Sequence, residues 1–225
     1  MPLKISKKFI TNKDQMGAKR KLSDIKFLVI HDTANTGYNA GAMSHYNFVQ
    51  NRKGTYGSAN YYVDDEIILQ IIPDDIISWG VGDTWARTDK TRKDIKNSNS
   101  LNVELCINCN ADPDKAYKNL IYLAKYLISK YKFNLDNVVR HFDATNKPCP
   151  GSWKDNNWAK WYKFKKDLME ACKMDDNKVS PWAAADWQWA IDMGLTDGTR
   201  PKDAATRQEL VSMLKRMFDK IKEAN

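Results

Sequence analysis

Five short stretches of the chain have the pattern of β-strands. Residues 27–30 form a continuous apolar run, which is typical of a buried strand. Two β-rich stretches flank the acidic residues 64–66, and this arrangement predicts a hairpin without the usual glycine. The predicted strands lie at residues 27–30, 58–63, 67–72, 101–107 and 138–139.

Helical patterns separate these strands. Asn39 is predicted to cap a helix over residues 40–51, and Asp112 precedes a helical pattern with apolar side chains on one face. A third amphipathic helix is expected over residues 158–172, whereas the polar residues 83–100 indicate a long loop. Because strands and helices alternate, the sequence predicts an α/β domain with a central mixed β-sheet flanked by helices.

The pattern changes after residue 172. A polar break is followed by a Trp-rich helical segment, and Thr206 and Glu209 have the spacing of a capping box at the start of a last helix. We therefore predict a division into four parts: a basic N-terminal extension (1–26), an α/β domain (27–172), a linker (173–179) and a small helical module (180–225).

Charge is concentrated at the front of the chain. The 225 residues carry 36 Lys and Arg against 28 acidic side chains, and residues 1–26 alone hold eight basic and two acidic ones. Such a segment favours anionic partners, so we expect it to be attracted to a membrane or to wall polymers; a solvated arm is the alternative. The chain has no helix-turn-helix, zinc-finger or RNA-binding signature, so no specific nucleic-acid partner is predicted.

No apolar run in residues 1–26 is long enough for the core of a signal peptide, and no window of the chain approaches 18 apolar residues. We therefore expect the protein to be made in the cytoplasm without a signal peptide and to reach any target in the cell wall only after release. The four cysteines are too few for a disulfide scaffold.

Three residues have the pattern of a zinc site. His31 and His141 each follow an apolar run, and Cys149 lies eight residues beyond His141 in a proline-rich loop. Three separated ligands without a fourth are typical of catalytic zinc, which keeps one position open for water. The alternative is that each is an isolated polar residue of the core or of a loop.

The segment 141–151 (HFDATNKPCPG) resembles the C-terminal zinc motif of the type 2 N-acetylmuramoyl-L-alanine amidases, which include phage endolysins and peptidoglycan recognition proteins. Further segments resemble the family in the expected order: the strand ending in His31, residues 58–63 (SANYYV), Trp79 before a glycine-rich turn, and residues 100–105 (SLNVEL). The resemblance covers about residues 20–172.

This resemblance implies that Zn²⁺ is held by His31, His141 and Cys149. It also implies hydrolysis of the amide bond between N-acetylmuramic acid and L-alanine in peptidoglycan. Glu104 would act as the general base and Lys147 would stabilise the oxyanion. The alternatives are that Glu104 is an outward-facing strand residue paired with a lysine, and that Lys147 is a solvated loop charge.

The chain departs from the family at two positions. Gly80 stands where many members have a histidine, and Asn60 replaces a histidine that is often found in the hairpin strand. We expect both to face the substrate groove, with Trp79 and Trp85 as candidates for its wall. His45 matches no ligand of the family and is expected to be structural.

Residues 180–225 resemble a single S-layer-homology unit, which implies binding to anionic secondary cell-wall polymers; shielding of the amidase or dimerisation is the alternative, and the oligomeric state stays open. The leading hypothesis is a lytic endolysin or autolysin of a Gram-positive host, with clostridia as candidates. The alternative is a non-catalytic peptidoglycan-binding protein of the same fold.

Overall fold

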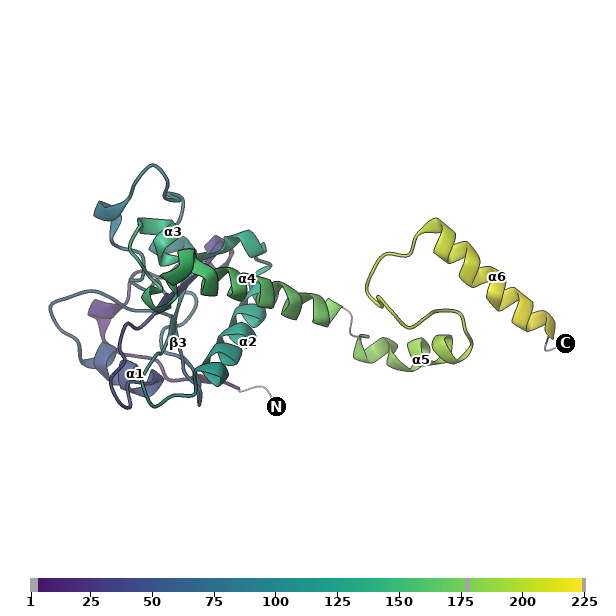
Figure 1. Cartoon of the computed structure of the whole chain (residues 1–225), viewed down its shortest axis with the longest axis horizontal. Coiled ribbons are helices and arrows are strands. Elements are labelled where there is room, and N and C mark those ends of the chain that lie inside the picture. Colours follow the sequence, from purple (N-terminus) through teal and green to yellow (C-terminus); the bar gives the residue numbers. More distant parts are fainter. Residues whose placement is uncertain (1–3, 177–178, 224–225) are drawn as a thin grey trace. The chain divides into compact units, whose positions relative to one another are not determined.

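The computed structural model describes residues 4–176 and 179–223. The chain divides into two compact units, Met1–Leu168 and Met169–Asn225. The first unit contains the sheet, and the second consists mainly of two helices joined by a loop; Figure 1 labels the main elements of both.

A six-stranded sheet with the order β1-β4-β3-β5-β2-β6 forms the centre of the first unit. Neighbouring strands are parallel except for the antiparallel pair β3 and β4. This mixed sheet confirms the predicted α/β class. The strands are β1 (Ile5–Lys7), β2 (Phe27–Asp32), β3 (Tyr61–Val63), β4 (Ile68–Gln70), β5 (Ser100–Leu105) and β6 (Val138–Arg140).

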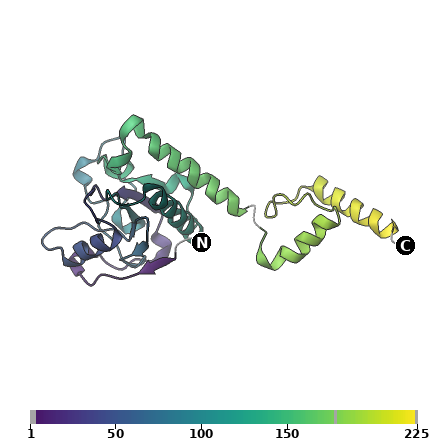
Figure 2. The same cartoon turned by 60° about the horizontal axis from the view of Figure 1, so that its bottom comes forward.

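The α-helices of the described residues are α1 (Ala42–Asn51), α2 (Pro113–Tyr131), α3 (His141–Thr145), α4 (Asp155–Asp176), α5 (Ala184–Asp192) and α6 (Arg207–Glu223). Helices α2 and α4 lie side by side, and Tyr117 of α2 donates a hydrogen bond to Asp167 of α4 (Figures 1 and 2). Val29 of β2 lies in one hydrophobic cluster with Ala144 of α3. Since side chains alternate along a strand, His31 lies on the same face as Val29.

The side chain of Asp64 explains the hairpin without a glycine. Its Oδ1 atom accepts hydrogen bonds from the amides of Glu66 and Ile67, which closes the turn between β3 and β4. Its Oδ2 atom accepts from the amide of Ala42 at 2.8 Å, so the same carboxylate caps α1. The predicted cap at Asn39 was therefore wrong, because the capping group comes from a distant turn.

The N-terminal residues are part of the sheet, so the predicted boundary at residue 26 was wrong. Strand β1 pairs with β4, and Ile10 lies in the hydrophobic core with 4% of its surface exposed. Arg20 is also buried and donates to the carbonyl of Ser100 at 2.7 Å. The sequence did not indicate this edge strand because of its many lysines. Lysine is common in edge strands because it prevents further strand pairing. Residues 1–3 lie outside the described part of the chain.

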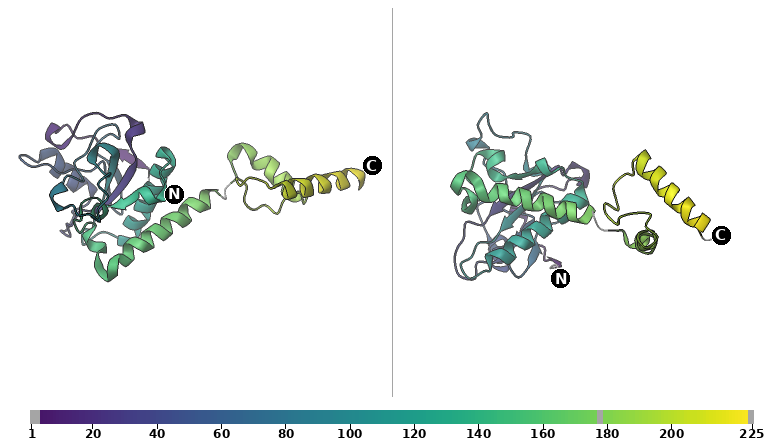
Figure 3. Two further views of the ribbon diagram at one scale, coloured as in Figure 1. Left: turned by 90° about the horizontal axis from the view of Figure 1, so that it is seen from above. Right: turned by 45° about the vertical axis from the view of Figure 1, so that its right-hand side comes forward.

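The second unit contains α5 and α6, joined by a long loop (Figure 3). The predicted capping box is confirmed: Thr206 and Glu209 each accept a hydrogen bond from the other's backbone amide. Helix α4 continues to Asp176, so the first four residues of the predicted linker 173–179 are helical, and residues 177–178 lie outside the described part. Within the described residues, none of the helices has the length and apolar character needed to cross a membrane.

Candidate active site

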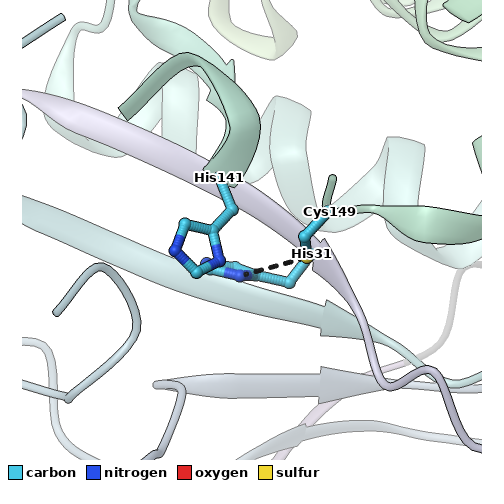
Figure 4. Close-up of side chains that lie close together, drawn as sticks. All are labelled: His31, His141 and Cys149. Carbon is cyan, nitrogen blue, oxygen red and sulfur yellow. Dashed lines mark hydrogen bonds between the residues drawn. The ribbon is translucent and has the colours of Figure 1, made fainter. Parts of the chain in front are cut away.

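Two parallel strands bring the predicted metal ligands together. His31 is the penultimate residue of β2, and His141 directly follows β6, which pairs with β2. The carboxyl ends of parallel strands meet at one edge of a sheet, where sites often form. Cys149 reaches this edge from the loop after α3, and one ligand atom from each of the three residues lies within 4.8 Å of the others (Figure 4).

The geometry and the donor types fit zinc. The Sγ atom of Cys149 is 3.6 Å from Nδ1 of His31. Two donors on one tetrahedral zinc, with bonds of about 2.0–2.1 Å to nitrogen and about 2.3 Å to sulfur, lie about 3.6 Å apart. Moreover, Nε2 of His141 is buried without a hydrogen-bond partner among the described residues.

Burial shifts the pKa values of the three donor residues. Burial lowers the pKa of His31 to about 4 and that of His141 to about 2, so both imidazoles are neutral at pH 7, as a metal ligand requires. Burial, assisted by the negative charge of Glu104, raises the pKa of the Cys149 thiol. This thiol therefore has to lose a proton when a metal binds.

Glu104 and Lys147 lie at the same site. Glu104 of β5 is paired in register with His31 of β2, so both side chains project from the same face. Burial, reinforced by the charge of Asp32, raises the pKa of Glu104 well above its usual range, and its Oε2 atom has no hydrogen-bond partner among the described residues. Lys147 is half-exposed, and its Nζ atom lies 3.0 Å from Oδ2 of Asp83.

A cavity of about 340 Å³ contains the site. It is lined by the three predicted ligand residues, by Glu104 and by Lys147. Trp79 is also in its wall, whereas Trp85 is not among the lining residues and has 86% of its surface exposed.

Three further residues contact the site: His45, which was expected to be structural, and Asp83 and Asn102, to which no role was assigned from the sequence. His45 lines the cavity, stacks on Tyr62, and donates from Nδ1 to the carbonyl of Gly41 at 2.9 Å. Asp83 contacts Lys147, and its Oδ2 atom is 3.6 Å from Nε2 of His141. Asn102 is fully buried, with Oδ1 at 3.0 Å from Nε2 of His31. Nothing in the local sequence marks Asp83 or Asn102.

The two departures from the family lie in different surroundings. Gly80 lines the cavity, as expected. Asn60 does not: it is completely buried, and its side chain bonds to backbone carbonyls and to Ser78. The expectation that Asn60 faces the groove was therefore wrong, because its amide is needed to satisfy buried polar groups.

Comparison with known proteins shows the family of the chain. Residues 21–152 match the family described as N-acetylmuramoyl-L-alanine amidase. The chain is 33% identical over 130 residues to the N-acetylmuramoyl-L-alanine amidase CwlH of Bacillus subtilis, covering 58% of this chain and 49% of CwlH. It is 25% identical over 222 residues to the amidase CwlL of Bacillus licheniformis, covering 96% of this chain and 59% of CwlL.

Among solved structures, the catalytic domain of XlyA superposes with a TM-score of 0.62 at 28% identity, over 74% of this chain and 99% of that domain. The match to the family over residues 21–152 includes more than half of the chain. The protein belongs to the N-acetylmuramoyl-L-alanine amidase family, the type 2 amidases that the motif in residues 141–151 resembles. The chain spans only 38–49% of the length of the first three curated relatives.

Proposed function

We propose that this protein is a zinc-dependent amidase that cleaves the bond between N-acetylmuramic acid and L-alanine in peptidoglycan. The observation that carries the proposal is the convergence of His31, His141 and Cys149 on a cavity that also contains Glu104. Two buried imidazoles and a partly buried thiol, beside a carboxylate whose Oε2 atom has no hydrogen-bond partner among the described residues, are suited to metal-assisted hydrolysis. The relatives named as N-acetylmuramoyl-L-alanine amidases support the choice of bond.

Each polar side chain has a defined part in the reaction. His31, His141 and Cys149 would hold the zinc, which would supply Lewis-acid chemistry for the scissile carbonyl. Glu104 takes a proton from the attacking water and delivers it to the leaving amine of L-alanine, because it lines the cavity and its Oε2 atom has no other hydrogen-bond partner among the described residues. Lys147 stabilises the negative charge that develops on the carbonyl oxygen, and Asp83 holds its ammonium group at the rim of the cavity.

The biological setting is a lytic endolysin or an autolysin that acts on a Gram-positive wall. The relatives from Bacillus and the solved structure of an endolysin from Bacillus subtilis support this part of the proposal. A clostridial host is a narrower form of the same proposal. The formal net charge of +8 favours attraction to anionic wall polymers.

We further propose that residues 180–225 form a module that binds anionic secondary cell-wall polymers. Its support is the helix–loop–helix of α5 and α6 and a cavity of about 510 Å³ beside the capping box. Arg216 and Arg200, the latter paired with Glu209 at 2.8 Å, lie in its lining together with Asp197 and Asp203. Arginine is well suited to carboxylate and phosphate groups because its planar guanidinium forms paired hydrogen bonds.

The metal ligands can be tested with two cysteine variants of the full chain. We expect Cys149→Ser to lose zinc and to lose hydrolysis of purified Gram-positive peptidoglycan. The matched control is Cys109→Ser, because Cys109 is an exposed thiol outside the site and its loss should change neither property. Elemental analysis should find about one zinc per chain in the wild type and in the control. Normal zinc content and activity in Cys149→Ser would exclude Cys149 from the ligand set.

A further inference from the structure

A chain of buried polar side chains runs beneath the candidate zinc site. It consists of Asn60, Ser78, Asn102 and His31, and none of these residues has more than 2% of its surface exposed. Each is joined to the next by a side-chain hydrogen bond of 2.8–3.0 Å. Because buried polar groups must find partners, the direction of each hydrogen bond can be worked out from one end.

The direction is set at Asn60. Its Nδ2 atom faces the backbone carbonyls of Pro73 and Ile76 at 3.3 and 3.4 Å, and a carbonyl can only accept. The opposite atom, Oδ1, therefore accepts, and it lies 2.8 Å from Oγ of Ser78. Two oxygens at this distance need a proton between them, so the hydroxyl of Ser78 donates to Asn60.

Because its proton is donated to Asn60, the hydroxyl of Ser78 can only accept a hydrogen bond from Asn102. At 2.9 Å from Ser78, the Asn102 side chain must present its Nδ2 atom as the donor. This orientation places Oδ1 of Asn102 3.0 Å from Nε2 of His31. Because a carbonyl oxygen only accepts, Nε2 carries the proton of the neutral imidazole. The lone pair is then on Nδ1, the atom that lies 3.6 Å from Sγ of Cys149.

We propose that Asn102 is a positioning residue for the metal: with Ser78 and Asn60 it fixes the tautomer and the ring orientation of His31, so that Nδ1 is presented to zinc. This inference rests on the proposed function because it requires a zinc site. Partners that hold a metal-binding histidine by its other nitrogen raise metal affinity and are often carboxylates or carbonyls. Here the partner of His31 is the side-chain amide of Asn102. Its orientation is set through Ser78 by Asn60, whose own amide donates to backbone carbonyls.

Gly80 makes room for this arrangement. A Cβ atom at position 80 would lie 2.3 Å from Cγ and Oδ1 of Asn102, much closer than two such atoms can approach. The two departures from the family therefore both support this chain of hydrogen bonds. Gly80 leaves space for Asn102, and the amide of Asn60 accepts from Ser78. Gly80→Ala should displace Asn102 from His31 without removing any ligand of the metal.

The test measures zinc affinity of the full chain by competition with a chromogenic chelator. We expect Asn102→Ala to bind zinc about 10–100-fold more weakly, the usual effect of losing such a partner. Ser78→Ala, which frees the amide of Asn102 to turn over, should show a smaller loss. Asn102→Asp keeps an oxygen acceptor for Nε2 and should retain affinity within a few-fold. The absorption spectrum of the Co²⁺-loaded protein should change in Asn102→Ala and be restored in Asn102→Asp.

Asn119→Ala is the matched control, since Asn119 donates from its amide to the carbonyl of Asp64, away from the metal ligands. The unfolding free energy of each variant in excess chelator reports the stability of the fold without metal. A second check is Gly80→Ala combined with Asn102→Ala: because the steric conflict then disappears, the double variant should bind zinc no more weakly than Asn102→Ala alone.

The outcomes separate the two proposals. Failure of the wild type to bind zinc would overturn the proposed function. Wild-type zinc binding together with unchanged affinity and an unchanged cobalt spectrum in Asn102→Ala would overturn the positioning role alone. If the affinity of Asn102→Ala falls only in proportion to its loss of stability in chelator, as in Asn119→Ala, the residue is merely structural and the inference is also wrong.

Discussion

Asp74 is the residue whose removal should most clearly destabilise the α/β unit. Its carboxylate is 7% exposed and accepts hydrogen bonds from four side chains. Oδ1 accepts from Tyr61 at 2.6 Å and from Gln70 at 3.0 Å, and Oδ2 accepts from Lys130 at 2.8 Å and from Tyr131 at 2.5 Å. The group therefore joins β3 and β4 to the last turn of α2.

The size of the effect follows from which partners are buried. In Asp74→Ala the hydroxyl of Tyr61, which is 1% exposed, loses its acceptor inside the protein, whereas the buried amide of Gln70 keeps only the carbonyl of Ile72 at 3.3 Å. Each buried donor left unpaired costs about 1–3 kcal/mol. Lys130 can turn toward solvent because 38% of its side chain is exposed, so its contribution is small. We therefore expect a loss of about 2–4 kcal/mol, which comes from the unpaired hydroxyl of Tyr61 and the weakened hydrogen bonding of Gln70.

The assay is a urea titration of the full chain in the presence of a chelator. Hydrogen exchange of peptides from the sheet reports the unfolding of the α/β unit separately. Asp167→Ala is the matched control: Asp167 also accepts from a tyrosine and a lysine, but its side chain is 29% exposed, so we expect about 1 kcal/mol or less. Asp74→Asn keeps an acceptor for Tyr61 and should fall between the two. Equal losses in Asp74→Ala and Asp167→Ala would refute the reasoning.

Two further predictions concern the site. Glu104→Gln should keep zinc but lower the hydrolysis rate by about 10²–10⁴-fold, the usual contribution of a general base; a near-normal rate with bound zinc would assign the base elsewhere. The pKa of His31 is about 4 in the folded protein and 6.5 in the reference state, so the unfolded chain binds the proton first as the pH falls. The free energy of unfolding of the chelated protein should therefore decrease as the pH falls from 6.5 toward about 4. Acid titration of the unfolding free energy of wild type and His31→Gln checks this, and an equal dependence on pH in both would contradict it.

The sequence was informative where local pattern decides structure. The apolar run before His31 and the motif in residues 141–151 predicted which strand ends carry the donors, because strand ends and short motifs are local features. The capping box at Thr206 was predicted for the same reason, since its two partners are three residues apart.

Features that depend on distant partners could not be read in this way. The strand β1 was hidden because its pairing partner β4 lies more than 60 residues away, and short lysine-rich edge strands have a weak pattern. The carboxylate that caps α1 comes from Asp64, 22 residues from Ala42. Asn102 stands 71 residues from His31, and only the sheet register and the space at Gly80 bring their side chains together.

The most direct test of the central claim is mass spectrometry of the fragments released from purified Gram-positive peptidoglycan, with a zinc chelator, without it, and after zinc is restored. The account predicts stem peptides with a new free amine on L-alanine beside intact glycan strands, lost on chelation and regained with zinc. Sedimentation of the protein with the wall without release of any fragment would contradict it and favour a non-catalytic binding protein. Release that continues unchanged in the chelator would contradict the role of the metal.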